Sequence, residues 1–167
     1  MAQTNEIKPF VMTHEADAPR DLVFKVWTEN EHLKKWMSPK GFVMTEATND
    51  LRPGGTFLYC LRSPDGKELW GKWVYREITP PSRIVLVNSF SDPKGGLTRH
   101  PMSATWPLEM LATTTLTENN GRTSLSLEWI PLNPTDEERK TFDTTHDGMR
   151  IGWSGTFEQL DAYLKTL

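Results

Sequence analysis

The chain has 167 residues, of which 37% are hydrophobic and 25% are charged, and its formal net charge is −3. This length predicts a single domain that buries roughly 70% of the surface of its unfolded chain. The acidic balance and the lack of a basic patch exclude nucleic acid as an expected partner. Seven tryptophans concentrate large, rigid apolar surface in few side chains.

The start of the chain and its single cysteine carry no targeting or metal-binding signal. No apolar run reaches the ~18 residues that a membrane-spanning helix requires, and the polar start does not read as a signal sequence. We therefore expect a cytoplasmic protein without a membrane span, with residues 1–8 as a loose leader and 9–167 as one domain. Cys60 has no Cys or His partner at metal spacing and is interpreted as a buried strand residue. Neither a metal nor a cofactor is expected.

The first half of the chain predicts one strand followed by two short helices. Apolar and polar residues alternate over 10–17, which is typical of a strand. Pro19 suits a first helical turn and precedes an amphipathic stretch that ends at Trp27. The spacing of Thr28 and Glu31 matches a capping box, which predicts a second short helix up to Trp36.

An antiparallel meander of six strands is predicted between residues 42 and 130. Turn signals occur at 53–55, 64–66, 80–82 and 119–121, with no helical period between them. Only residues 91–106 break this pattern. Loops of that length inside a compact domain tend to be lids, binding loops or interaction segments.

One long helix is predicted over residues 133–167. Asn133 before Pro134 and the pair Thr135 and Glu138 are both typical of a helix start. An apolar stripe at helical spacing consists of Phe142, His146, Met149, Trp153, Phe157, Leu160 and Leu164. A second face carries Gly148, Gly152 and Gly155, which we interpret as places of close backbone approach.

Short stretches spread over most of the chain resemble a known family. They are Trp-Met-Ser-Pro at 36–39, Leu-Arg-Pro-Gly-Gly at 51–55, Gly-Lys-Trp at 71–73, Ile-Thr-Pro-Pro-Ser-Arg-Ile-Val at 78–85 and Gly-Trp at 152–153. With the order of elements, they resemble the START and birch-pollen-allergen type of helix-grip fold, also called SRPBCC. Within it, the chain is similar to the family of activators of the ATPase of the ninety-kilodalton heat-shock protein. Met37 departs from the tryptophan that many members repeat there, and the separate N-terminal domain of the eukaryotic co-chaperone has no counterpart.

This resemblance implies an α+β fold in which a curved antiparallel sheet of six to seven strands wraps around the C-terminal helix. Two short helices follow the first strand, and an apolar pocket lies between sheet and helix. The family does not imply one activity, because its relatives differ in function. From the pattern of the residues alone, a hollow and a filled interior are about equally expected.

Three hypotheses about function follow. The first is a binding protein for a hydrophobic or aromatic small molecule, with a pocket formed by inward-facing residues. These are Phe57, Trp73, Tyr75, Met110, Trp129, Phe142, His146, Met149 and Trp153. Trp27, Trp36 and Trp70 are interpreted instead as packing anchors.

The second hypothesis is a protein-interaction or stress-response module that docks through the loop 91–106. The residues of this loop that would take part are Leu97, His100, Met102 and Trp106. A homodimer through this loop or through a sheet edge is also consistent with the sequence. The third hypothesis is a cyclase- or isomerase-type enzyme that uses His146 with a carboxylate. No catalytic residue is assigned, because the sequence places no second catalytic group beside His146. The favoured interpretation of His146 is a core histidine that is hydrogen-bonded to a backbone carbonyl or to a residue of the short helices.

Overall fold

The computed structural model describes residues 7–167, so most of the predicted leader lies outside the described residues. The elements in chain order are β1 (Phe10–Ala16), α1 (Arg20–Thr28), α2 (Asn30–Trp36), β2 (Val43–Asn49), β3 (Thr56–Arg62), β4 (Glu68–Thr79), β5 (Arg83–Ser91), β6 (Leu97–Thr98), β7 (Met110–Asn119), β8 (Arg122–Pro131), α3 (Asp136–Thr144) and α4 (His146–Leu164). No helix in this part of the chain is both long and apolar enough to cross a membrane.

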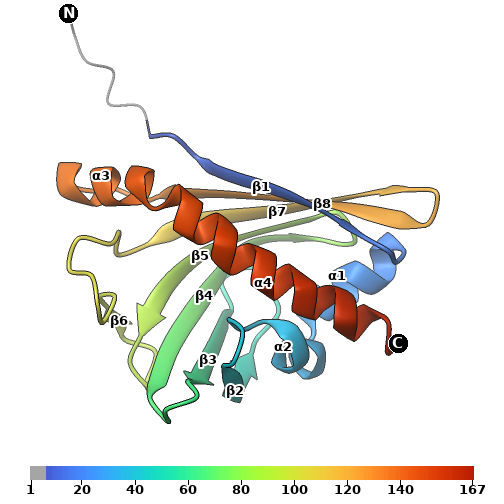
Figure 1. The fold of residues 1–167 in the computed structure, drawn as a ribbon, viewed down its shortest axis with the longest axis horizontal. Helices are drawn as coiled ribbons and strands as arrows, with labels where there is room; N and C mark the ends of the chain where they lie inside the picture. The colour runs from blue at the N-terminus through green and yellow to red at the C-terminus, as the bar shows by residue number, and fades with distance from the viewer. Residues whose placement is uncertain (1–6) are drawn as a thin grey trace, which may run out of the picture.

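The strands form one antiparallel sheet in the order β1-β8-β7-β5-β4-β3-β2, and the short β6 pairs with β5. The first strand joins the far end of the meander by pairing with β8. Figure 1 shows the curved sheet with α4 crossing one face and with α1 and α2 beside the C-terminal half of α4. The predicted α+β helix-grip architecture is confirmed, with β6 as an additional two-residue strand.

The predicted capping box at the start of α2 is wrong. Thr28 is the last residue of α1, and its hydroxyl donates to the Phe24 carbonyl at 2.8 Å. The N-cap of α2 is Glu29, whose side chain makes no capping hydrogen bond. The threonine therefore closes the first helix because its hydroxyl has a carbonyl of its own helix within reach.

The C-terminal segment is two helices rather than the single helix predicted. The break lies at Thr145, where φ is −102° and ψ is 0°. The Thr145 side chain stays at the end of α3, because its hydroxyl donates to the Thr141 carbonyl at 2.5 Å. The capping box of Thr135 and Glu138 does start α3, with reciprocal hydrogen bonds of 3.1 and 2.9 Å.

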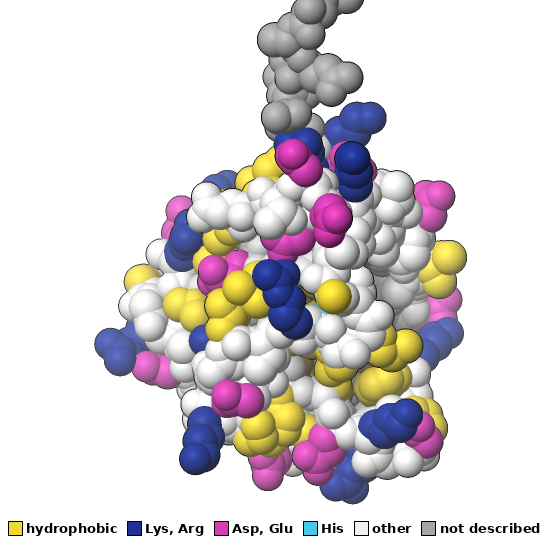
Figure 2. All heavy atoms as spheres, turned by 90° about the vertical axis from the view of Figure 1, so that its left-hand side faces the viewer, with side chains coloured by type: hydrophobic (Ala, Val, Ile, Leu, Met, Phe, Trp, Pro, Cys, Tyr) yellow, Lys and Arg dark blue, Asp and Glu magenta, His cyan; other side chains and the backbone are white. Residues whose placement is uncertain are grey.

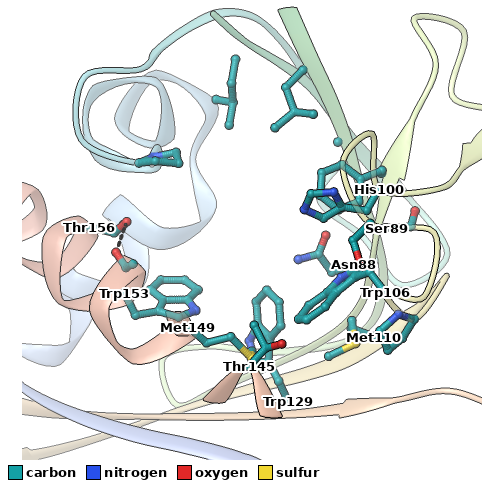
Figure 3. A pocket seen from close by; sticks show the side chains of 18 of the residues that line it. Asn88, Ser89, His100, Trp106, Met110, Trp129, Thr145, Met149, Trp153 and Thr156 are labelled. Carbon is teal, nitrogen blue, oxygen red and sulfur yellow. Dashed lines mark hydrogen bonds between the residues drawn. The ribbon is translucent and has the colours of Figure 1, made fainter. Parts of the chain in front are cut away.

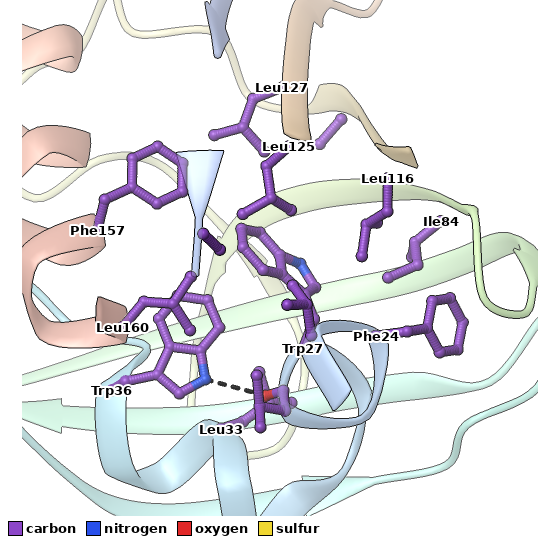
Figure 4. Packing of buried hydrophobic residues seen from close by; sticks show 14 of the residues in the cluster. Phe24, Trp27, Leu33, Trp36, Ile84, Leu116, Leu125, Leu127, Phe157 and Leu160 are labelled. Atoms are coloured by element: carbon purple, nitrogen blue, oxygen red, sulfur yellow. Dashed lines mark hydrogen bonds between the residues drawn. The ribbon is translucent and has the colours of Figure 1, made fainter. Parts of the chain in front are cut away.

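Side chains fill the space between the sheet, α1, α2 and the C-terminal half of α4. Trp36 is fully buried, and its indole N–H donates to the Val26 carbonyl at 2.9 Å. Trp27 packs on it with ring centroids 4.7 Å apart. Figure 4 shows Phe157 and Leu160 of α4 meeting Leu125 and Leu127 of β8 around these rings. Trp27 and Trp36 are thus packing anchors, as predicted.

Candidate ligand pocket

A cavity of about 590 Å³ lies between the sheet and the N-terminal half of α4. Its wall includes many aromatic and thioether side chains: Met37, Tyr59, Trp70, Trp73, Phe90, Trp106, Met110, Trp129, Met149 and Trp153. Figure 3 shows Trp153, Met149 and Thr145 on one side of this space and Asn88, His100 and Trp106 on the other. The volume falls in the range of pockets that hold small organic molecules.

Two glycines of α4 help to keep this space open. A Cβ atom at Gly152 would have no heavy atom within 4 Å, and one at Gly148 would meet only the Thr145 methyl carbon at 3.8 Å. Both residues line the cavity. The predicted close backbone approach at these two positions is therefore wrong. Gly155 lies near the side chain of Lys40, at an ordinary contact distance of 3.5 Å.

A third glycine, on β4, shapes the opposite wall. A Cβ atom at Gly71 would come within 2.4 Å of the Tyr59 ring, so only glycine leaves room for this ring. Tyr59 pairs with Gly71 across β3 and β4. Burial raises the pKa of the Tyr59 phenol to about 12, and a hydrogen bond with Trp73 offsets only part of this effect. The phenol is therefore uncharged at neutral pH.

The sheet contributes a row of three inward-facing side chains to the pocket. In register across β4, β5 and β7, Trp73 lies opposite Asn88, and Asn88 lies opposite Met110. Residues directly opposite in an antiparallel sheet point to the same face. The amide of Asn88 is thus placed between two apolar side chains in the wall of the cavity.

The loop 91–106 forms a wall of the pocket. His100 packs on Phe90 with ring centroids 4.7 Å apart, and its Nδ1 accepts from the backbone N–H of Met102 at 2.9 Å. Desolvation lowers the pKa of His100, which favours the neutral ring. Because Nδ1 accepts a hydrogen bond, the proton of this neutral ring lies on Nε2.

Two polar contacts tie this loop to α3. Arg99 donates to Glu138 at 2.7 Å, and the Thr141 hydroxyl donates to that of Thr105 at 2.8 Å. Burial by itself would raise the pKa of Glu138, but hydrogen bonds from Thr135 and Arg99 outweigh it and lower this pKa. The carboxylate that caps α3 thus also holds the loop.

The polar side chains on the two sides of the pocket differ in the hydrogen bonds that they make within the protein. On the helical side, Thr145 donates to the Thr141 carbonyl, and Thr156 donates to the Gly152 carbonyl at 3.2 Å. On the opposite side, Figure 3 marks no hydrogen bond between Asn88 or His100 and the other pocket residues it draws. None of the described residues lining the cavity is Asp, Glu, Lys or Arg.

The structure brings together five of the nine residues predicted to bind a ligand. Those that line the cavity are Trp73, Met110, Trp129, Met149 and Trp153. Phe57, Tyr75, Phe142 and His146 do not line it, which corrects the predicted set. Phe57 and Phe142 are fully buried in the packing around it. Tyr75 points its hydroxyl at Asn49, to which it donates at 2.9 Å.

His146 lies beside the pocket instead of inside it. Its ring meets the rings of Phe142 and Phe10 edge-on, with centroid distances of 4.7 and 5.7 Å. Its buried Nε2 has no hydrogen-bond partner among the described residues, so the expected bond to a backbone carbonyl is absent there. Two His–carboxylate pairs do form among the described residues, His14 with Asp161 at 2.8 Å and His32 with Glu29 at 3.6 Å, and none of these residues lines the pocket.

The loop residues predicted to dock a partner divide into two groups. His100 and Trp106 line the cavity, and the rings of Trp106 and Phe142 have their centroids 6.3 Å apart. Met102 is 90% exposed and Leu97 is 42% exposed. Figure 2 views the side on which α3 and β6 lie, where hydrophobic side chains reach the surface in separate patches. A docking role of Leu97 and Met102 stays a prediction.

Several pocket residues were missed by sequence reasoning. Trp70, interpreted as a packing anchor, lines the cavity, as do Tyr59, Asn88 and Phe90. The alternation of Asn88 and Phe90 on one strand face could have indicated the last two. Residues 7–167 contain no cluster of three or more His, Cys, Asp or Glu side chains that could hold a metal ion.

Comparison with known proteins places the chain in a family. Residues 17–165 match the family described as activator of Hsp90 ATPase homolog 1-like protein. The chain belongs to this family. The resemblance drawn from the sequence is thereby confirmed.

Solved structures from bacteria share the fold. A protein from Nitrosomonas europaea is 26% identical with a TM-score of 0.75, over 95% of this chain and 94% of that one. One from Arthrobacter aurescens is 25% identical with a TM-score of 0.79, over 99% and 91% of the two chains. The AHSA1 protein from Silicibacter pomeroyi, at 16% identity and a TM-score of 0.71 over 95% and 99%, supports the fold alone. No curated protein matches the sequence.

Proposed function

We propose that this protein binds an apolar or aromatic small molecule in the cavity between the sheet and α4. The observation that carries the proposal is the contrast within one interior. The half next to α1 and α2 is packed solid, whereas the other half leaves about 590 Å³ open between aromatic walls.

Two further features support binding over a defect of packing. Glycine at 148 and 152 costs helix stability of roughly 1 kcal/mol each relative to alanine, yet keeps volume free on the pocket side. The wall is held in place by the bonds of the loop to α3 through Glu138 and Thr141. Ring surfaces buried on binding would stabilise a complex by about 25 cal/mol per Å² of apolar area.

The seven tryptophans allow a site-specific test. The indole N–H signals of uniformly ¹⁵N-labelled protein are recorded while 2-methylnaphthalene is added. Trp70, Trp73, Trp106, Trp129 and Trp153 line the cavity, and their signals are expected to shift with one common affinity. The Trp36 indole N–H is hydrogen-bonded to the Val26 carbonyl in the filled core, so its signal should not shift and serves as the internal control.

Native mass spectrometry of the purified protein and a thermal-shift screen of lipids and aromatic metabolites extend the test to natural compounds. Binding is expected to raise the midpoint of thermal unfolding, because a ligand that binds only the folded state stabilises it. The absence of any indole shift together with a uniformly silent screen would overturn the proposal.

A further inference from the structure

The charge of the pocket restricts its ligand more than its size does. The lining residues include no Asp, Glu, Lys or Arg. The two lining groups that could ionise stay neutral, because burial raises the pKa of Tyr59 and desolvation lowers that of His100. An ionised ligand would lose its hydration without gaining an opposite charge, which costs several kcal/mol or more. The pocket therefore selects against ions of either sign.

Two polar side chains of the pocket wall, Asn88 and His100, lie on neighbouring parts of it. Asn88 and Phe90 are two residues apart on β5, so their side chains share a face and are separated by roughly 7 Å along the strand. The His100 ring packs on Phe90, which brings it to the same wall as Asn88. Figure 3 shows both side chains at the edge of the open space, with Trp153 and Met149 opposite.

Both groups can donate a hydrogen bond. The neutral His100 ring carries its proton on Nε2, because Nδ1 accepts from Met102. The Asn88 amide supplies two N–H donors. A ligand oxygen at this wall would satisfy them, whereas a purely apolar ligand would shield them from water without a partner.

Resting on the proposed function, we infer that the ligand is an uncharged ring compound whose carbonyl or hydroxyl oxygen accepts hydrogen bonds from His100 and Asn88. The tryptophans opposite hold its apolar body. His100 and Asn88 are thus the residues that determine specificity, and the loop 91–106 takes part in binding because it carries one of them.

Three naphthalenes with one ring system test this inference by the indole-shift titration at pH 7.5. 2-Acetylnaphthalene offers a carbonyl, 2-methylnaphthalene offers no acceptor, and 2-naphthoate is an anion. The ketone is expected to bind about 2- to 10-fold more tightly than the methyl compound, which is the range for one net hydrogen bond. The carboxylate is expected to bind at least about tenfold more weakly than the ketone.

Two substitutions test whether His100 and Asn88 cause the preference for the ketone. His100→Phe keeps a ring on Phe90 and removes the donor, and Asn88→Leu keeps the volume and removes the amide. Each is expected to reduce the preference for the ketone over the methyl compound, measured as the ratio of the two affinities in the same variant. Thr156→Val is the matched control, because its hydroxyl is already bonded to Gly152 and the preference should stay unchanged. An unchanged Trp36 signal shows that each variant is folded.

The outcomes separate the two proposals. Binding of the methyl compound and the ketone with equal affinity, or tight binding of the carboxylate, would overturn the inference and leave the proposed function standing. A preference for the ketone that persists in both variants would also overturn it. Failure of all three compounds to shift any pocket indole, together with a silent screen of lipids and aromatic metabolites, would overturn the proposed function as well.

Discussion

The two halves of the space beneath α4 are built by the same sheet and the same helix, yet one is filled and the other is open. Beside α1 and α2, Trp36 and Leu160 are fully buried among apolar neighbours (Figure 4). Toward α3, Trp153 and Met149 face a cavity of about 590 Å³ (Figure 3). The curvature of a helix-grip sheet leaves more space than one helix fills, and the two short helices close only one end of it.

This difference separates the part of the interior that stabilises the fold from the part that we propose binds a ligand. Closely packed side chains in the filled half stabilise the fold, because every buried methylene there has neighbours on all sides. In the open half, ring faces such as that of Trp153 border a cavity in addition to their packing contacts. The following predictions test that division.

The largest effect is expected from shortening a side chain in the filled half. Leu160→Ala should lower the free energy of unfolding by about 2–5 kcal/mol, because it leaves a new cavity in a packed core. Met149→Ala, on the pocket side of the same helix, should cost less than about half of that, since it enlarges a space that already exists. Urea unfolding measures both, and equal losses would contradict the division.

The next effect concerns the bond that holds the loop to α3. Glu138→Gln should lower the free energy of unfolding by about 1 kcal/mol at pH 7, a value discounted because Arg99 is half exposed. The pKa of Glu138 is lowered in the folded protein, so this contribution is present in full above the usual carboxyl value of 4.5. It should be lost as the pH falls through the lower, folded-state pKa.

Unfolding of the parent protein and the Glu138→Gln variant between pH 7 and pH 3 checks this sign. The difference in stability between them should shrink at the acid end. The exposed neighbour Glu137, changed to glutamine, is the control and should leave stability nearly unchanged. A difference between parent and Glu138→Gln that stays constant over the whole range would show that the charge plays no part.

A smaller effect of opposite sign is expected at Gly152. Gly152→Leu should raise the free energy of unfolding by about 0.5–1 kcal/mol, because leucine favours a helix more than glycine and has open space there. The same change should weaken the binding of 2-methylnaphthalene, since Gly152 lines the pocket. Thermal unfolding and the indole titration measure the two consequences. A lower free energy of unfolding would mean that another part of the protein packs closely against Gly152, as the sequence predicted.

The smallest effect is expected on the outer face of α4. Glu158 pairs with Lys40, but the two side chains are 65% and 62% exposed. An exposed pair contributes little, so Glu158→Leu should change the free energy of unfolding by less than about 0.5 kcal/mol. A larger loss of the free energy of unfolding, measured with urea, would show that the outer face of α4 also stabilises the fold.

The sequence by itself determined the order of elements and most of the fold. The alternation in β1 and β8, the turn signals of the meander and the capping box at Thr135 are local patterns, and they have local causes in backbone geometry. The motifs at 36–39, 51–55 and 71–73 indicated the family, which the match over residues 17–165 confirmed. Within the predicted site, residues on inward strand faces such as Trp73 and Met110 were found because the period of a strand fixes the side.

Only the tertiary structure decided which inward residues face a cavity and which face the packed interior. Phe57 and Trp73 lie on one sheet face with ring centroids 4.9 Å apart, yet only Trp73 reaches the open space. The break at Thr145 turns His146 toward Phe10 and Phe142. The loop 91–106 brings His100 onto Phe90, which is two residues from Asn88 on β5. A glycine in a helix can allow close packing of a neighbouring element, or it can leave open space beside the helix. The sequence does not distinguish these two cases, because they depend on which element lies opposite the glycine. That is set by contacts between residues far apart in the chain, and no local pattern encodes it.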